Sequence, residues 1–306
     1  MIIVAGEALI DRIHYPDGRE AAIPGGGPYN TARTIGRLGG EVGFLGRLST
    51  DAFGRRMRAG LEADGVAVPE SLDSDAPPTL AIADVDGEGV ATYRFRTDGT
   101  AAAGLTAADV AAALADRPAA LHVGTLGLVL APIAATLADA VRRLDPATLL
   151  MVDPNCRGSA IADREAYLVR LTGILARADV VKVSTDDLAY LAPGVSARAA
   201  ARTLLDAGAT LVLVTDGARS VRLLSRAFEA ELPVPRVTIV DTVGSGDAFG
   251  GAFLAWWIGA GHGRDDLSDR TGVEEATRRA IAVAAVTCQR AGADPPTRAE
   301  AGWPAT

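Results

Sequence analysis

The amino-acid sequence predicts an α/β protein in which helices flank a parallel sheet. Short apolar segments alternate with helical patterns over most of the 306 residues, and this alternation is typical of βαβ units. Hydrophobic residues make up 49% of the chain, which is enough for one large core and a small accessory unit. We therefore expect a single α/β domain over residues 1–306, with a small β-sheet attached where two segments break the alternation.

The expected elements of the first half begin with the apolar strand IIVAG and a helix over 29–38. The strand EVGFLGRL and a helix over 53–64 follow. Residues 119–138 contain a single ionisable side chain, His122, over a length that could span a bilayer. Glycines and Pro132 interrupt this stretch. We expect a buried strand (LHVGTLGLVL) and then a helix beginning at Pro132, and no membrane span.

The second half repeats the rhythm without a strict sequence repeat. Strands are expected at TLLMVD, DVVKVS and TLVLVTDG, and helices over 166–177 and 197–207. A strand-like segment, VTIV, precedes Asp241, and the apolar helix AFLAWWIGA closes the pattern.

Two segments are expected to form β-hairpins instead of βαβ units. One carries DGEG between TLAIADV and VATYRFR, and the other surrounds the turn Pro16-Asp17-Gly18. Together they predict a small β-sheet from insertions at about 12–23 and 79–98. At the edge of the main domain, on the substrate side, such a sheet is suited to act as a lid.

Composition excludes several classes of protein. The formal net charge of -8 repels phosphate backbones and anionic membranes, so we expect neither nucleic acid nor membrane as a partner. A Walker-type phosphate loop needs a Gly-Lys pair, and the only lysine, Lys182, follows Val181. The two cysteines do not suggest a disulfide framework. The N-terminus does not resemble a signal peptide, and we expect a cytoplasmic protein.

The strongest motif is DTVGSGDAFGG, which runs from Asp241 to Gly251 at a strand-to-helix junction. Glycines there let successive N–H groups face one point at a helix N-terminus, where partial positive charge favours an anion. Asp247 falls at the first helical turn, beside this anion site. An ordinary N-cap acid would not explain the flanking glycines and the second acid, Asp241.

The second motif is PGGGPYNTA, from Pro24 to Ala32, which opens an early helix. It could be only a flexible loop. Its position after the first lid hairpin favours a ligand loop, because backbone exposed by glycine can approach a polyhydroxy ligand closely. Asn30 can both donate hydrogen bonds to neighbouring hydroxyls and accept them.

Together, the runs GGGPYNTARTIGRLGGEVGFLGRLSTDAFG and DTVGSGDAFGGAFL resemble the two signatures of the ribokinase-like, or PfkB-type, carbohydrate kinases. The resemblance covers nearly the whole chain and implies transfer of the γ-phosphoryl group of ATP to a sugar hydroxyl. Magnesium, and in many members a monovalent cation such as K⁺, would assist. GEALID, the triple glycine and YRFRTDGTAA look closest to fructokinase-like members, so fructose is the expected substrate.

Other functions remain compatible with the sequence. Ribokinases, nucleoside kinases and 2-keto-3-deoxygluconate kinases share the framework. A sensor without catalytic activity could have kept the fold, although the intact Asp247 argues against it. An NAD-dependent enzyme is disfavoured because no Gly-x-Gly-x-x-Gly turn follows IIVAG.

The resemblance also assigns roles to individual residues. Asp247 is implied as the base that takes the proton from the sugar hydroxyl, and the amides of Gly244, Ser245 and Gly246 as the anion hole. The implied sugar-binding residues are Asp11, Gly26, Gly27 and Asn30. A DxNxR element adds two residues that face the phosphates or the sugar, Asn155 and Arg157.

At the nucleotide end the resemblance implies Ser184, Thr215, Gly217 and Arg219. The family's Asn-x-x-Glu motif, which organises the magnesium shell, is changed here at both ends and leaves Asp187. A monovalent cation would bind near Asp241. In the lid, strand alternation puts Arg96 on the face opposite Phe95, and we expect Arg96 to approach the sugar while the aromatic face packs within the lid or in a homodimer.

Overall fold

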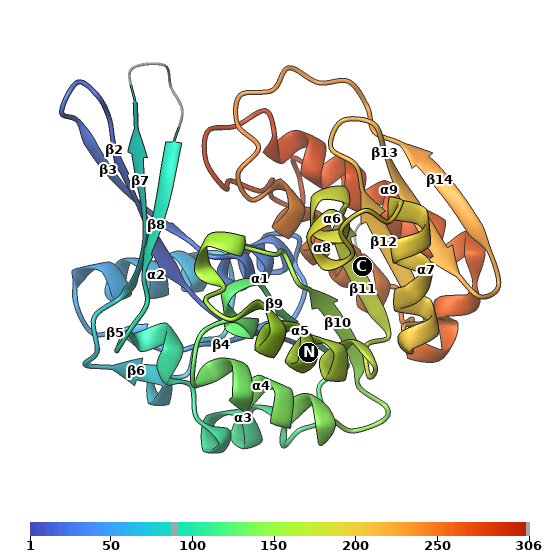
Figure 1. The fold of residues 1–306 in the computed structure, drawn as a ribbon, viewed down its shortest axis with the longest axis horizontal. Helices are drawn as coiled ribbons and strands as arrows, with labels where there is room; N and C mark the ends of the chain where they lie inside the picture. The colour runs from blue at the N-terminus through green and yellow to red at the C-terminus, as the bar shows by residue number, and fades with distance from the viewer. Residues whose placement is uncertain (87–90, 304–306) are drawn as a thin grey trace.

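The largest unit of the computed structural model, which describes residues 1–86 and 91–303, is an eight-stranded sheet (Figure 1). Its order is β14-β13-β12-β11-β10-β9-β1-β4. All neighbours from β12 to β4 are parallel, whereas β13 and β14 form an antiparallel edge. The bounds are β1 (Ile2–Ala5), β4 (Val42–Leu45), β9 (Ala120–Gly124), β10 (Leu149–Asp153), β11 (Val180–Ser184), β12 (Leu211–Thr215), β13 (Ser220–Ser225) and β14 (Glu229–Pro233).

The central strands are apolar on both faces because helices cover both. One face of the sheet packs against helices from the two ends of the chain. These are α1 (Gly27–Arg37), α2 (Ala52–Ala63), α8 (Ser245–Gly259) and α9 (Arg270–Thr287). The other face packs against α3 (Ala107–Leu114), α4 (Ile133–Arg142), α5 (Arg164–Leu175), α6 (Thr185–Leu191) and α7 (Ala197–Ala207) (Figure 1). The predicted fold class is thereby confirmed.

The register of the parallel strands aligns their polar carboxyl ends. Asp153 of β10 pairs with Gly124 of β9, and Thr215 of β12 pairs with Ser184 of β11. Ligands of open α/β sheets bind outside this edge, where backbone groups and loop side chains are accessible. The fold therefore places the strongest sequence motifs at one edge.

A second sheet projects from this edge in the order β3-β2-β7-β8 and is called the lid sheet here (Figure 1). It consists of β2 (Leu9–His14), β3 (Glu20–Gly25), β7 (Thr79–Val85) and β8 (Ala91–Arg96). The two hairpins join through the parallel pair β2 and β7. Both predicted hairpins are present, although the first begins at Leu9; most of the DGEG turn lies outside the described residues. The two-residue strands β5 (Leu48–Ser49) and β6 (Asp73–Ser74) pair separately.

One predicted strand is too long and another is absent. LHVGTLGLVL is a strand only to Gly124, after which a 3₁₀ helix runs over Thr125–Leu128 because the chain turns at Thr125, whose φ is 50°. VTIV is not a strand: Ile239 is 55% exposed. Proline at positions 233 and 235 lacks an N–H for a ladder just before VTIV. None of the helices in the described ranges has the length and apolar character needed to cross a bilayer.

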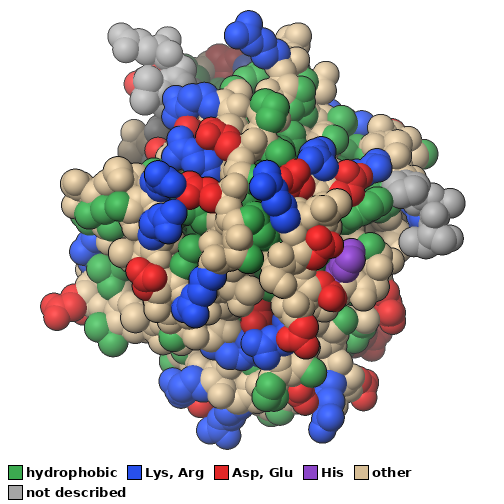
Figure 2. All heavy atoms as spheres, turned by 90° about the vertical axis from the view of Figure 1, so that its right-hand side faces the viewer, with side chains coloured by type: hydrophobic (Ala, Val, Ile, Leu, Met, Phe, Trp, Pro, Cys, Tyr) green, Lys and Arg blue, Asp and Glu red, His purple; other side chains and the backbone are tan. Residues whose placement is uncertain are grey.

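The charged surface consists largely of paired arginines and carboxylates. On the face drawn in Figure 2, basic and acidic side chains are interspersed instead of gathered by sign. Arg198, for example, donates to both carboxylate oxygens of Glu229. Exposed pairs of this kind contribute little to the free energy of unfolding, so the core supplies most of the stability.

Candidate active site

A cavity of about 570 Å³ lies at the carboxyl edge of the sheet, beneath the lid sheet. Both glycine-rich motifs reach it, although they are about 217 residues apart in the chain. The predicted residues that line it are Asp11, Gly26, Gly27, Asn30, Asn155, Arg157, Asp241, Gly244, Gly246 and Asp247.

Asp247 is the third residue of α8 and is 8% exposed. The side-chain amide of Asn30 donates to its Oδ2 at 2.9 Å. Burial raises the pKa of Asp247, and the Asn30 hydrogen bond and nearby cations oppose the rise. A carboxylate held in this way is oriented and is a stronger base than an exposed aspartate, as general-base catalysis needs.

The first turn of α8 offers free amides to an anion. Its N-cap, Gly244, has φ 73°, and a side chain there would lie 2.4 Å from the Cβ of Ala293. The Ser245 amide donates to the Thr242 carbonyl at 3.2 Å, whereas within the described part of the chain the amides of Gly244, Gly246 and Asp247 have no acceptor. The predicted anion hole is therefore corrected at one position, where the Asp247 amide replaces that of Ser245.

The cavity wall beside Asp247 also presents hydrogen-bond acceptors. Oδ1 of Asn30 is buried and has no partner among the described residues, so it can accept from a ligand hydroxyl. Burial and the charge of Asp247 raise the pKa of Asp11 to about 6, and Arg157 opposes this. A Cβ on Gly27 would lie 2.2 Å from Oγ1 of Thr125, so only glycine permits this approach.

The DxNxR element also reaches the cavity, and its contacts to the phosphates or the sugar stay a prediction. Asn155 has φ 38° and donates through its side chain to Thr125 Oγ1 at 3.5 Å. Arg157 is exposed at the rim and is a nearby cation for both Asp11 and Asp247.

Sequence reasoning missed Glu7, which is 0% exposed and lines the cavity. Its two carboxylate oxygens accept from the amide of Gly27 at 3.1 Å and from that of Gly127 at 2.8 Å. Burial raises its pKa to about 8, while these two hydrogen bonds oppose the rise. Glu7 thus fixes the first turn of α1. The available signal was an acid placed directly after an apolar strand, in GEALID.

In the sequence, Lys182 serves only as evidence against a Walker loop. The structure puts this residue, 4% exposed, in the cavity wall, where its Nζ donates to Asp153 Oδ2 at 2.8 Å. The signal was a lone lysine inside the apolar strand VVKVS.

The predicted nucleotide residues lie at the same edge but outside the cavity lining. Ser184 caps α6, and Asp187 completes a capping box with it. Asp187 Oδ1 also accepts from the Cys156 amide at 2.7 Å, so its carboxylate is committed to the protein. Gly217 and Arg219 lie in the turn after β12, which carries Thr215, and Arg219 is paired with Asp216. Their contacts to a nucleotide stay a prediction.

Two further predictions concern charged residues. Asp241 lines the cavity, and its carboxylate accepts from the amides of Val243 at 3.0 Å and Gly292 at 2.8 Å. Arg96 is exposed and does not line the cavity, whereas Phe95 does. The alternation was right, but Arg96 lies on the outer face, and its predicted approach to the sugar is corrected. No group of three metal-binding side chains occurs among the described residues.

An α/β fold with a buried general base beside the free amides of a helix N-terminus, next to a site that offers acceptors to hydroxyls, defines a phosphotransferase acting on a small alcohol. Comparisons with known proteins make the class specific. Residues 1–300 match the model of the pfkB family carbohydrate kinases, and the chain belongs to this family. It is a phosphotransferase that acts on a sugar hydroxyl.

Its relatives include fructokinases. The fructokinase of Rhizobium leguminosarum bv. trifolii is 34% identical over 259 residues, which are 83% of this chain and 79% of that protein. The structure of the fructokinase of Xylella fastidiosa with bound ATP superposes with a TM-score of 0.86 at 29% identity, covering 98% and 96% of the two chains. The structure of the fructokinase of Vibrio cholerae O395, in a form with bound fructose, ADP and calcium ion, superposes with a TM-score of 0.82 at 25% identity. The match covers 95% of this chain and 94% of that one.

Proposed function

We propose that this protein is a fructokinase, which transfers the γ-phosphoryl group of ATP to a hydroxyl of fructose. The observation that carries the proposal is the hydrogen bond from Asn30 to Asp247, because it joins the sugar loop to the base beside the free amides. The fructokinase relatives support the choice of sugar.

The mechanism follows from this geometry. Asp247 accepts the proton of the sugar hydroxyl, the hydroxyl oxygen bonds to the γ-phosphorus, and the bond from that phosphorus to the bridging oxygen breaks as ADP leaves with the electron pair. The free amides of Gly246 and Asp247 stabilise the charge on the phosphoryl oxygens. Burial raises the pKa of Asp247 and so favours proton acceptance.

Charge at the sugar end favours a neutral acceptor. Glu7 and Asp11 both line this end of the cavity, and Arg157 is the nearby cation. With Arg96 on the outer face, no cation of the described lid strands lines the cavity to hold the carboxylate of a sugar acid. A ketohexose therefore fits better than 2-keto-3-deoxygluconate, because the ionised carboxylate of Asp11 repels the carboxylate of a sugar acid.

Magnesium is the proposed divalent ion, and when bound to ATP it would neutralise charge on the donor phosphates. The carboxylate of Asp187 already accepts hydrogen bonds from the amides of Cys156 and Ser184. It therefore fits an indirect role at the magnesium site, in which it orients the loop that contains Cys156. Asp153 Oδ1 is a buried acceptor without a partner among the described residues and fits a contact to an ordered water. K⁺ is proposed near Asp241, whose carboxylate fixes the Val243 and Gly292 backbone.

We also propose that Ser184, Thr215, Gly217 and Arg219 receive the nucleotide, since they occupy the same strand edge as the anion hole. The lid sheet is proposed to close over the sugar and to pair with a second copy in a homodimer, because its inward-facing Ile23 is 38% exposed. Light scattering measures the mass in solution, and the mass of a single chain would contradict the dimer. Both cysteines are free, in keeping with a cytoplasmic enzyme.

An acceptor panel tests the function. ADP release is measured with fructose, ribose, adenosine, aminoimidazole riboside and 2-keto-3-deoxygluconate at matched concentrations. We expect kcat/KM to be highest for fructose, by about tenfold or more, which corresponds to about 1.4 kcal/mol. A higher value for a riboside or for the sugar acid would overturn the proposed substrate.

A further inference from the structure

Lys182 is the only lysine of the chain, and its ammonium group is buried beneath the first turn of α8. A Cβ added to Gly246 would lie 2.9 Å from Lys182 Nζ, so the missing side chain lets the helix approach the ammonium. Both residues line the cavity together with Asp247. The lysine therefore lies where the free amides of α8 begin.

This position combines favourable and unfavourable effects for a cation, because Asp153 pairs with the ammonium at 2.8 Å but the first turn of α8 lies against it. The N-terminus of a helix carries partial positive charge, so a second positive charge beneath it is repelled. Burial of the ammonium also costs solvation, and a buried ion pair such as Lys182–Asp153 gives little net stability. Stability alone does not explain the lysine, whereas an anion that arrives at the same point does.

The charged groups that face Lys182 leave it positive. Asp153, Asp187 and Asp247 raise its pKa, although burial opposes them. His122 is the other titratable neighbour; burial lowers its pKa to about 3, so it is neutral at physiological pH.

We propose that Lys182 is a catalytic residue that donates a hydrogen bond to the phosphoryl group during its transfer from ATP to the sugar. The inference rests on the proposed kinase function. Lys182 keeps its proton throughout: the proton of the acceptor hydroxyl goes to Asp247, the new oxygen–phosphorus bond forms, and the bond to the bridging oxygen of ADP breaks. The fixed ammonium offsets charge on the phosphoryl oxygens together with the amides of Gly246 and Asp247.

The kinetic test compares three variants. Lys182→Met is expected to lower kcat about 10²- to 10³-fold, the usual effect of removing one donor to a developing charge, with the Kd for ADP changed less than about twofold. Because Asp153 is then buried without its cation, the double variant Lys182→Met/Asp153→Asn removes both charges and is expected to restore Tm without restoring kcat. A double variant with wild-type kcat would overturn the proposal.

The control is another buried carboxylate, Asp179, which pairs with both Arg177 and Arg264. Arg177 pairs with Asp179 before β11, at the end of the sheet remote from the cavity. Arg177→Met is expected to lower Tm and to leave kcat within about twofold, since Arg177 touches no substrate. A loss of kcat equal to that of Lys182→Met would show that any broken pair has this effect and would sink the proposal.

A spectroscopic test does not depend on turnover. With lysine labelled with ¹³C at Cε, the wild-type chain gives one side-chain signal in NMR spectra. We expect this signal to shift with a non-hydrolysable ATP analogue and to stay near its free position with ADP, which lacks the γ-phosphoryl group. Equal responses to both nucleotides, or none, would overturn the role of Lys182. The acceptor panel tests the choice of sugar separately, and the variants are assayed with whichever acceptor the wild type uses.

Discussion

Asp247 and Asn30 form the contact on which catalysis depends most directly. We expect Asp247→Asn to lower kcat by roughly two to four orders of magnitude, the scale of a positioned general base. The substituted amide oxygen can still accept from Asn30, so Tm and the affinity for ADP should change little. Steady-state kinetics and calorimetry check this. Turnover within a few-fold of wild type would contradict the role of Asp247.

Asp11 predicts a pH dependence at the sugar end. Its pKa is raised to about 6, so the ionised acceptor is lost as pH falls through 6. We expect KM for fructose to rise below about pH 6 while KM for ATP changes little. A KM for fructose that is flat between pH 5 and 8 would contradict this assignment.

The same shift predicts the sign of a stability change. The folded protein binds a proton at Asp11 more tightly than the unfolded chain does. This tighter proton binding stabilises the folded protein. The stabilisation is fully present below pH 3.8, the ordinary pKa of aspartate, and is lost as pH rises to about 6. Relative to Asp11→Asn, the wild-type free energy of unfolding should therefore fall over that window, which denaturant titrations at several pH values would detect.

At the scale of the elements, the close approach of α1 and α8 brings Asn30 to Asp247. Gly251 allows it, because a Cβ there would lie 2.8 Å from the Thr31 carbonyl oxygen. We expect Gly251→Ala to lower the free energy of unfolding by about 1–3 kcal/mol and to lower kcat, since the helices must separate. Gly259→Ala on the same helix meets open space and should stabilise by about 0.5–1 kcal/mol with kcat unchanged. Equal effects of Gly251→Ala and Gly259→Ala on the free energy of unfolding and on kcat would disprove the role of the spacing between α1 and α8.

The lid sheet gives a second prediction at this scale. Phe95 lines the cavity and Arg96 does not. We expect Phe95→Ala to raise KM for fructose roughly tenfold, as for a lost contact of about 1.4 kcal/mol. Arg96→Ala should leave it within about twofold. The reverse order of effects would return Arg96 to the sugar.

The elements also show what sequence could predict. Helix α7 was predicted at its observed bounds because Ser196 caps it and Gly208 ends it. The outer position of Arg96 could not be predicted, because alternation separates the two faces of a strand without saying which meets the cavity. The Glu7 and Lys182 contacts depend on partners in distant loops and strands, which no local pattern encodes.

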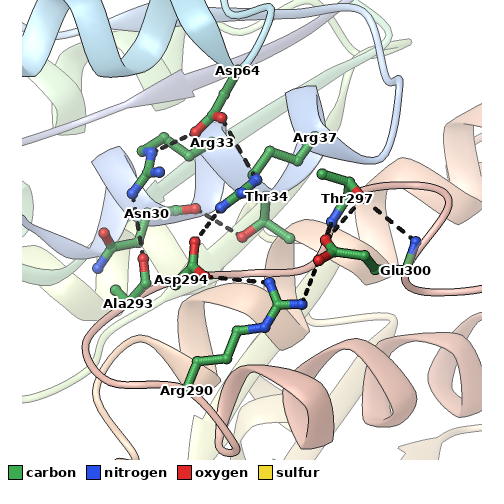
Figure 3. A network of polar contacts seen from close by, with 10 residues as sticks. All are labelled: Asn30, Arg33, Thr34, Arg37, Asp64, Arg290, Ala293, Asp294, Thr297 and Glu300. Carbon is green, nitrogen blue, oxygen red and sulfur yellow. Dashed lines mark hydrogen bonds and ion pairs between the residues drawn. The ribbon is translucent and has the colours of Figure 1, made fainter.

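Across the whole molecule, polar contacts join α1 to the C-terminal segment, residues 290–300 (Figure 3). Arg37 Nη1 contacts Asp294 Oδ1 at 2.5 Å, and Arg33 donates to the Ala293 carbonyl at 3.3 Å. Ala293 in turn packs against Gly244. The C-terminal segment therefore connects α1, which carries Asn30, to the anion hole at the start of α8.

Neutralising Asp294 tests this connection. We expect Asp294→Asn to cost about 1 kcal/mol of stability or less, as for other half-exposed pairs, and yet to raise KM for ATP. Asp139→Asn, which breaks exposed pairs on α4, is the matched control and should leave KM unchanged. An unchanged KM in Asp294→Asn would show that the segment only covers α1.

The helices α1 and α8 both begin at the cavity, and the side chain of Glu7 occupies the N-terminus of α1. Glu7 accepts from the first residue of α1, while the amides of Gly244, Gly246 and Asp247 have no acceptor within the described part of the chain. The two helix N-termini therefore differ, and a phosphate binds more favourably at the start of α8 than at the start of α1. A sugar that already carries a phosphate would bring a second anion near Asp11, where the nearby cation, Arg157, is exposed at the rim. We therefore expect each sugar to be phosphorylated once, with its product rejected as a new acceptor.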